Sequence, residues 1–211
     1  STTPSDCVDA DAGHYVDQSG QSIQTACNAG TYNPSIGSTT QSACLDASPG
    51  YYVDSSLGTG QSTQTACNAG TYNPSIGSTT PSDCVDADAG HYVDQSGQSI
   101  QTACNAGTYN PSTGSTTLSD CLDASPGYYV NSSLGTGQSS QTACLAGTYN
   151  PSTGSTISTD CIVADAGHYV DSSLGIAQYT QTACNAGTYN PSIGSTTPSD
   201  CVDADAGHYV D

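Results

Sequence analysis

Apolar side chains in this chain occur in short groups separated by Gly, Pro, Ser, Thr and Asn. They show no 3.6-residue period, so the pattern predicts no helix, and no group approaches the roughly 18 residues of a membrane span. In the stretch 27–44, segments 31–33 and 38–40 are predicted as short strands. The turn between them begins at Asn33 and ends at Gly37, which is typical of a type I turn that exits through a left-handed glycine.

The stretch 27–44 is one copy of an internal repeat. Two cysteines 17 residues apart open and close each copy, and the whole period of 37 or 40 residues contains two hairpins of about 20 residues. We therefore predict a small disulfide-rich all-β fold, a linear solenoid-like array of β-hairpins with no helix. The paired units span approximately 7–43, 44–83, 84–120, 121–160 and 161–200, and a partial repeat occupies 201–211.

In every second hairpin both cysteine positions change together, the opening one to Ala and the closing one to Gln: Ala10/Gln24, Ala47/Gln64, Ala87/Gln101, Ala124/Gln141 and Ala164/Gln181. Because both ends of one hairpin change, we predict that each disulfide closes one hairpin, at about 3 kcal/mol of stabilisation per loop. The predicted pairs are Cys27–Cys44, Cys67–Cys84, Cys104–Cys121, Cys144–Cys161 and Cys184–Cys201, with Cys7 bonded to upstream chain. An alternative ladder, 7–27, 44–67 and so on with Cys201 left over, satisfies the same arithmetic.

The recurring Cys-x-Ala-Gly-Thr-Tyr, with a Gly/Ser/Thr turn and a closing cysteine, resembles the ephrin-receptor-like cysteine-rich repeat, a relative of the tumour-necrosis-factor-receptor modules. That family typically has Cys-x-x-Cys at each junction, whereas this chain keeps one of the two cysteines. After Cys7 the second would fall at Ala10, and before Cys27 the first would fall at Gln24. The resemblance covers the whole chain and implies a receptor or adhesin ectodomain.

The predicted core is a seam of small apolar residues and tyrosines. An aliphatic residue follows every closing cysteine, at Val8, Leu45, Val85, Leu122, Ile162 and Val202. A valine follows each tyrosine of the alternate hairpins, at Val16, Val53, Val93, Val130, Val170 and Val210. We expect these side chains to pack with the tyrosines and cystines, so that each hairpin contacts mainly its neighbours.

Composition and charge limit the class of protein. Only 34% of the residues are hydrophobic, against the usual ~45–50%, so disulfides must supply stability that a large core would otherwise provide. Eleven cysteines at regular spacing point to an oxidising, extracellular or cell-surface location. The net charge of −19 without Lys or Arg excludes nucleic acid as a partner. Residues 1–17 recur as 195–211, so we expect the chain to be a slice of a longer array.

The sequence offers no catalytic residues, because it lacks nucleophile and phosphate-binding motifs and because repetition disfavours one asymmetric pocket. His14, His91, His168 and His208 alternate with tyrosines at the same repeat position, which favours a structural role over a metal-ligating one. Carboxylates that recur close together are weak Ca²⁺ ligand candidates; they are Asp9, Asp11, Asp86, Asp88, Asp203 and Asp205. The sequence calls for no other cofactor.

Covalent glycans are a further expectation, because Ser/Thr-rich tracts near Pro are typical O-glycosylation sites. Examples are Thr39, Thr40, Thr79 and Thr80, and Asn131 begins the one N-linked sequon that Pro does not block. The first functional hypothesis is a structural extracellular fibre, filament or surface stalk whose partner is itself, as longer chain or by lateral assembly. The alternatives are a receptor or adhesin ectodomain with an unidentified ligand, and a calcium-organised surface layer.

Overall fold

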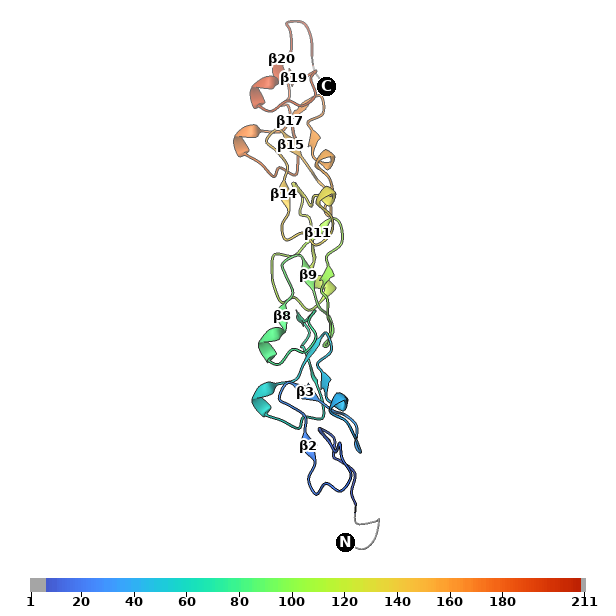
Figure 1. Cartoon of the computed structure of the whole chain (residues 1–211). Helices are drawn as coiled ribbons and strands as arrows, with labels where there is room; N and C mark the ends of the chain where they lie inside the picture. Colours follow the sequence, from blue (N-terminus) through green and yellow to red (C-terminus); the bar gives the residue numbers. More distant parts are fainter. Residues whose placement is uncertain (1–6, 210–211) are drawn as a thin grey trace. The chain divides into compact units, whose positions relative to one another are not determined.

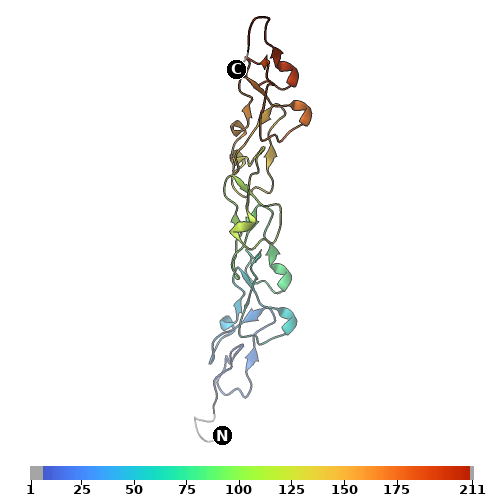
Figure 2. The same cartoon turned by 180° about the vertical axis from the view of Figure 1, so that it is seen from behind.

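The computed structural model describes residues 7–209, which form short strands and single turns joined by loops (Figures 1 and 2). These residues divide between two compact units. Of the described residues, the first unit comprises 7–88, Tyr92–Thr102 and Thr113–Thr117, and the second comprises Ala89–His91, Ala103–Ser112 and 118–209. The same two kinds of hairpin, one with a disulfide and one without, build both units, so the all-β hairpin array predicted from the sequence is confirmed.

Each disulfide-closed hairpin has two antiparallel strands of two residues each, and the second strand follows the closing cysteine directly. These hairpins are β3 (Thr31–Tyr32) with β4 (Leu45–Asp46), β7 (Thr71–Tyr72) with β8 (Val85–Asp86), β11 (Thr108–Tyr109) with β12 (Leu122–Asp123), β15 (Thr148–Tyr149) with β16 (Ile162–Val163), and β19 (Thr188–Tyr189) with β20 (Val202–Asp203).

The hairpins that have Ala and Gln in place of the cysteines pair their strands in the same antiparallel way. They are β1 (His14–Tyr15) with β2 (Thr25–Ala26), β5 (Tyr51–Tyr52) with β6 (Thr65–Ala66), β9 (His91–Tyr92) with β10 (Thr102–Ala103), β13 (Tyr128–Tyr129) with β14 (Thr142–Ala143), and β17 (His168–Tyr169) with β18 (Thr182–Ala183).

The only helical elements in residues 7–209 are single 3-10 turns of three residues, because frequent Gly and Pro interrupt any longer helix. Five lie just before the closing cysteines: η2 (Gln41–Ala43), η4 (Pro81–Asp83), η5 (Leu118–Asp120), η7 (Ser158–Asp160) and η9 (Pro198–Asp200). Three lie in Ala/Gln hairpins: η3 (Ser55–Leu57), η6 (Ser132–Leu134) and η8 (Ser172–Leu174).

The strand that pairs with Thr31–Tyr32 differs from the prediction. Tyr32 lies opposite Leu45 and Thr31 opposite Asp46, so the predicted partner strand at 38–40 is wrong. Residues 38–40 instead lead into η2 and belong to the loop. The loop between the two strands is therefore longer than predicted. Gly37, within that loop, does adopt the expected left-handed conformation, with φ of 66°.

Glycines allow close packing between hairpins within each unit. In the first unit Gly50 has φ of 86°, and a Cβ built on it would overlap the carbonyl oxygen of Gly97. The Gly50 N–H also donates to the carbonyl oxygen of Asn73 at 2.7 Å. In the second unit the Gly127 N–H donates to the Asn150 carbonyl oxygen at the same distance. Backbones pack against each other here because no side chain intervenes.

The core contains fewer of the aliphatic residues than the sequence predicted. The valines after the alternate tyrosines are buried at Val53, Val93, Val130 and Val170, as expected, whereas Val16 is only half-buried and Val210 lies outside the described residues. The aliphatic residues after the closing cysteines do not belong to the core: Leu45, Val85, Leu122, Ile162 and Val202 are 43–47% exposed, and Val8 is 92% exposed. Both residues of each strand that follows a closing cysteine are exposed, so this strand lies at the surface of the hairpin and contributes no side chain to the core.

Candidate functional site

The disulfides are the most regular chemical feature of the structure. Each joins the two cysteines of one hairpin, with Cα–Cα distances of 5.5–5.7 Å, and the pairs are Cys27–Cys44, Cys67–Cys84, Cys104–Cys121, Cys144–Cys161 and Cys184–Cys201. These are the pairs of the first predicted ladder and differ from the 7–27, 44–67 alternative. Cys7 is exposed and has no disulfide partner within the described residues, so its bond to upstream chain stays a prediction.

A glutamine takes the place of the disulfide in the alternate hairpins. Its Oε1 accepts the backbone N–H of the residue after the opening alanine, at 2.6–2.8 Å in all five cases: Gln24 from Asp11, Gln64 from Ser48, Gln101 from Asp88, Gln141 from Ser125 and Gln181 from Asp165. The bond joins the same two ends of the hairpin that a cystine joins. Such a neutral hydrogen bond contributes about 1 kcal/mol. The sequence signalled this clamp only through the paired Ala and Gln.

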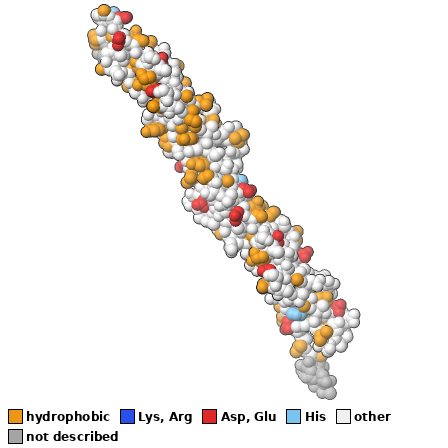
Figure 3. Space-filling view, turned by 90° about the vertical axis from the view of Figure 1, so that its left-hand side faces the viewer, with side chains coloured by type: hydrophobic (Ala, Val, Ile, Leu, Met, Phe, Trp, Pro, Cys, Tyr) orange, Lys and Arg blue, Asp and Glu red, His pale blue; other side chains and the backbone are white. Residues whose placement is uncertain are grey.

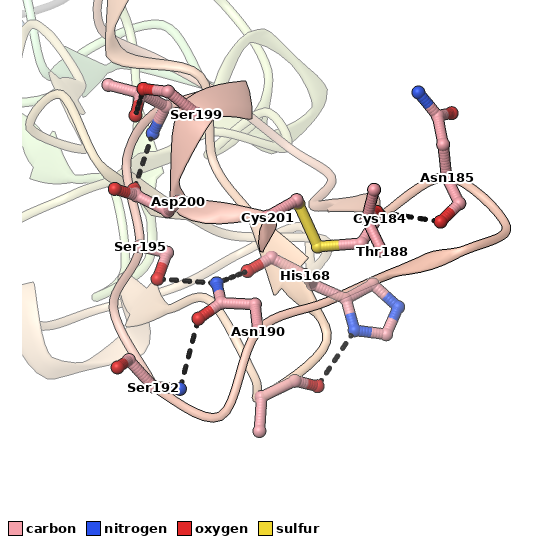
Figure 4. Close-up of a disulfide and its surroundings, with 12 residues drawn as sticks. His168, Cys184, Asn185, Thr188, Asn190, Ser192, Ser195, Ser199, Asp200 and Cys201 are labelled. Carbon is pink, nitrogen blue, oxygen red and sulfur yellow. Dashed lines mark hydrogen bonds between the residues drawn. A yellow bond between two sulfur atoms is a disulfide. The ribbon is translucent and has the colours of Figure 1, made fainter. Parts of the chain in front are cut away.

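Each disulfide hairpin also contains a buried asparagine that hydrogen-bonds across hairpins. Asn190, which is 5% exposed, donates through Nδ2 to the His168 carbonyl oxygen at 3.2 Å and to Ser195 Oγ at 2.7 Å (Figure 4). Its Oδ1 accepts the Ser192 N–H at 3.0 Å, which closes the turn. Asn33, Asn73, Asn110 and Asn150 are each 1% exposed and bond in the same way to the preceding hairpin. The turn prediction placed this asparagine correctly but missed its burial.

The calcium candidates are exposed, and some are already engaged. Asp11 and Asp88 accept hydrogen bonds from the Nε2 atoms of Gln24 and Gln101, at 2.7 and 2.6 Å. Asp9, Asp86, Asp203 and Asp205 are exposed carboxylates. Across residues 7–209, no three of the His, Cys and Asp side chains gather into a group that could hold a metal ion. The structure therefore does not bring the predicted carboxylates together as a ligand set.

The histidines face the backbone of their own turns. The Nδ1 atoms of His14, His91 and His168 lie 3.2–3.4 Å from the carbonyl oxygens of Ala12, Ala89 and Ala166. Tyr51 and Tyr128 occupy the same strand position in other hairpins, which fits a structural contact rather than a metal ligand. His208 is exposed.

The glycosylation candidates differ in their surroundings. Thr39 and Thr40 are exposed, whereas Thr79 and Thr80 are partly buried. The Oγ1 atoms of Thr40 and Thr80 lie 2.8 Å from Ser42 Oγ and Ser82 Oγ. A Cβ built on Gly30 would lie 2.7 Å from the Cγ2 methyl of Thr79, so this methyl packs over the glycine. Thr39 and Thr40 are thus the more accessible pair.

Asn131 caps η6. Its Oδ1 accepts the Ser133 N–H at 3.1 Å and the Ser133 Oγ–H at 2.6 Å. Asp54 and Asp171 make the same pair of bonds in the equivalent hairpins. An N-linked glycan is attached through the amide nitrogen, which this cap does not use.

The surface carries many exposed aliphatic side chains and aspartates but no Lys or Arg. Figure 3 shows hydrophobic side chains in several groups on the face in view, with aspartates among them. Within residues 7–209, no helix is long and apolar enough to cross a bilayer.

No family model matches the chain, and no curated protein matches it.

Proposed function

We propose that the protein is a structural component of an extracellular fibre, filament or surface stalk, built from tandem hairpins. The observation that carries this proposal is that the recurring polar side chains form hydrogen bonds within the hairpin array itself. The glutamines close hairpins, and the buried asparagines join each disulfide hairpin to the hairpin before it. Each repeat thus performs the same mechanical task, and we propose no enzymatic activity for it.

The five disulfides support secretion, because such bonds persist in oxidising compartments and are rare in the cytosol. A charge of −19 without a single Lys or Arg also suits a hydrated extracellular structure, since it keeps chains soluble through repulsion. We propose that O-linked glycans add to this hydration at exposed hydroxyls such as those of Thr39 and Thr40, with Asn131 as the N-linked candidate.

Electron microscopy of the native, unreduced material tests the proposal. A filament with an axial repeat on the order of 10 Å per hairpin, the spacing of packed sheets, is the expected result. Density beyond the polypeptide at Thr39, Thr40 or Asn131 would identify the glycans. Separate short particles attached to a different globular domain would overturn the structural proposal and favour a receptor or adhesin.

A further inference from the structure

The disulfides remove several segments of the chain from the covalent path that a pulling force follows. Each bond joins two cysteines 17 residues apart and holds their Cα atoms at 5.5–5.7 Å. Tension enters such a hairpin at its opening cysteine and leaves at its closing cysteine, so the residues between them carry no load. Because an extended chain spans at most ~3.3–3.6 Å per residue, each closed loop withholds roughly 50 Å of length.

The Ala/Gln hairpins have no such bypass. They lie in the segments 44–67, 84–104, 121–144 and 161–184, each of which runs from a closing cysteine to the next opening cysteine. In the hairpin 47–64, the bond from the Ser48 N–H to Gln64 Oε1 and the two-residue strands β5 and β6 hold the ends together. Tension on an Ala/Gln hairpin therefore acts directly on hydrogen bonds.

The disulfide hairpin that follows an Ala/Gln hairpin holds it in place. In the first unit the Val53 N–H donates to the Ser78 carbonyl oxygen at 2.9 Å, and Asn73 Nδ2 donates to the Tyr51 carbonyl oxygen at 3.2 Å. The second unit repeats these two bonds, from Val130 to Ser155 and from Asn150 to Tyr128. Because each contact belongs to one pair of neighbouring hairpins, its loss releases one hairpin and leaves the next one attached.

The disulfide hairpin keeps its own contact residues together when its neighbour opens. Asn73 Nδ2 donates to Ser78 Oγ at 2.8 Å, and Asn73 Oδ1 accepts the Ser75 N–H at 3.0 Å, all within the loop that Cys67 and Cys84 close. The disulfide limits the conformations of this loop even without its neighbours. The covalently closed hairpin is therefore a template on which an opened Ala/Gln hairpin can refold.

We propose that the array is an extensible load-bearing element. Under tension the Ala/Gln hairpins open in steps and re-form on relaxation, whereas the disulfides keep the other hairpins closed and fix the maximum length. The inference deepens the proposed structural function and rests on it only for its biological role, because extension is measured on single isolated chains.

Optical tweezers that pull on the two ends of the full chain test the proposal, without reductant and with Cys7 alkylated. The decisive variant, Ala47→Cys with Gln64→Cys, adds a disulfide to one Ala/Gln hairpin. The control, Ala47→Ser with Gln64→Ser, changes the same two positions to side chains that cannot form the bond. Mass spectrometry of the unreduced variant checks that the added disulfide has formed.

The strand register supports the added bond. Ala47 and Gln64 flank the paired strands β5 and β6 at the same distances along the chain as Cys67 and Cys84 flank β7 and β8. Both hairpins also have the same separation of 17 residues between these positions. The variant therefore places the new cysteines where the fold already forms a disulfide in the next hairpin.

The wild type should extend in separate steps, none longer than the ~80 Å that a 23-residue segment such as 44–67 spans when extended, and should recover when the force is released. The disulfide variant should lose one step and reach a maximum length shorter by roughly 50 Å, whereas the serine control should reach the wild-type length. Reduction of the stretched wild type should add roughly 50 Å for each disulfide broken.

Three results would overturn the proposal: extension of the whole chain in one step, a disulfide variant that retains every wild-type step, or a wild type that does not recover on relaxation. Failure of the proposed structural function is seen separately, in micrographs of native material. Filaments whose chains do not extend in steps would leave the structural function standing. Stepwise extension of a chain that forms no filaments would leave the extensible element standing.

Discussion

Gln64, at the position of the closing Cys84, closes its hairpin by accepting the backbone N–H of Ser48 at 2.7 Å, one residue after the position of the opening Cys67. The array therefore alternates a covalent clamp with a hydrogen-bonded one. Both opening residues, Ala47 and Cys67, are buried at 0–1% exposure, so the two clamps occupy equivalent surroundings. We therefore expect that a glutamine can partly replace a disulfide at this position.

The exchange can be tested in one hairpin. Replacing Cys67→Ala together with Cys84→Ala should destabilise the protein by about 3 kcal/mol, because the loop is no longer closed in the unfolded chain. Replacing Cys67→Ala together with Cys84→Gln should recover about 1 kcal/mol of this loss, through a bond to the Asn68 N–H. Urea denaturation with the other disulfides intact measures both. Equal stability of the two double variants would show that the glutamine is not a clamp.

Gly50 should be intolerant of a side chain. In Gly50→Ala the new Cβ would overlap the carbonyl oxygen of Gly97, in addition to the strain of an alanine at φ of 86°. Gly167→Ala is the matched control, because Gly167 has the same repeat position and φ of 81° but nothing within 4 Å of the built Cβ. We expect Gly50→Ala to lose about 3 kcal/mol more in urea denaturation than the control. Equal losses would mean that left-handed strain alone explains the glycine.

These contacts show where the sequence was informative. The paired change of both cysteines to Ala and Gln favoured the observed disulfide pairing over the alternative ladder, because the repeat supplied its own comparison. The strand partner of Tyr32 was missed, since apolar alternation is too short to fix register in strands of two residues. Leu45 was expected in the core because an aliphatic residue follows every closing cysteine, whereas in the structure it is 44% exposed.

The sequence did not predict that the asparagine of each disulfide-hairpin turn is buried. A polar residue beside Pro indicates a turn, and turns usually lie at the surface. The available signal was internal: Asn is retained at all five positions from Asn33 to Asn190, whereas the exposed asparagine after the opening cysteine becomes Leu145 in one copy. A position held constant in imperfect repeats indicates a contact that each copy needs.

The buried asparagine should therefore contribute more to the stability of the fold than the exposed asparagine after the opening cysteine. Asn73→Ala removes the bonds to the Tyr51 carbonyl oxygen, to Ser78 Oγ and to the Ser75 N–H, and should destabilise the protein by roughly 2–4 kcal/mol. Asn68→Ala, at an exposed position, should change stability by less than about 0.5 kcal/mol. Thermal unfolding of both variants tests this order. A small effect of Asn73→Ala would mean that water replaces the amide.

Acid should loosen the turns that an aspartate caps. The N–H groups of Thr80 and Thr79 donate to Asp83 Oδ2, at 3.0 and 2.8 Å, and lower the pKa of the Asp83 carboxyl below its ordinary value of 3.8. Thr197 and Thr196 lower the pKa of Asp200 in the same way. Because the folded-state pKa is the lower one, the stabilisation is fully present above the unfolded-state pKa and is lost as the pH falls through the folded-state pKa.

Amide hydrogen exchange across this acidic range, corrected for intrinsic rates, measures the effect at single residues. The Thr79 and Thr80 amides should lose protection as Asp83 is protonated, and Asp83→Ala should remove that protection at every pH. The hairpin 27–44 supplies the internal control, because Ala43 stands where Asp83 stands and the Thr39 and Thr40 amides have no such carboxylate. Equal pH dependence at Thr40 and Thr80 would show that general acid unfolding, rather than the Asp83 cap, controls these turns.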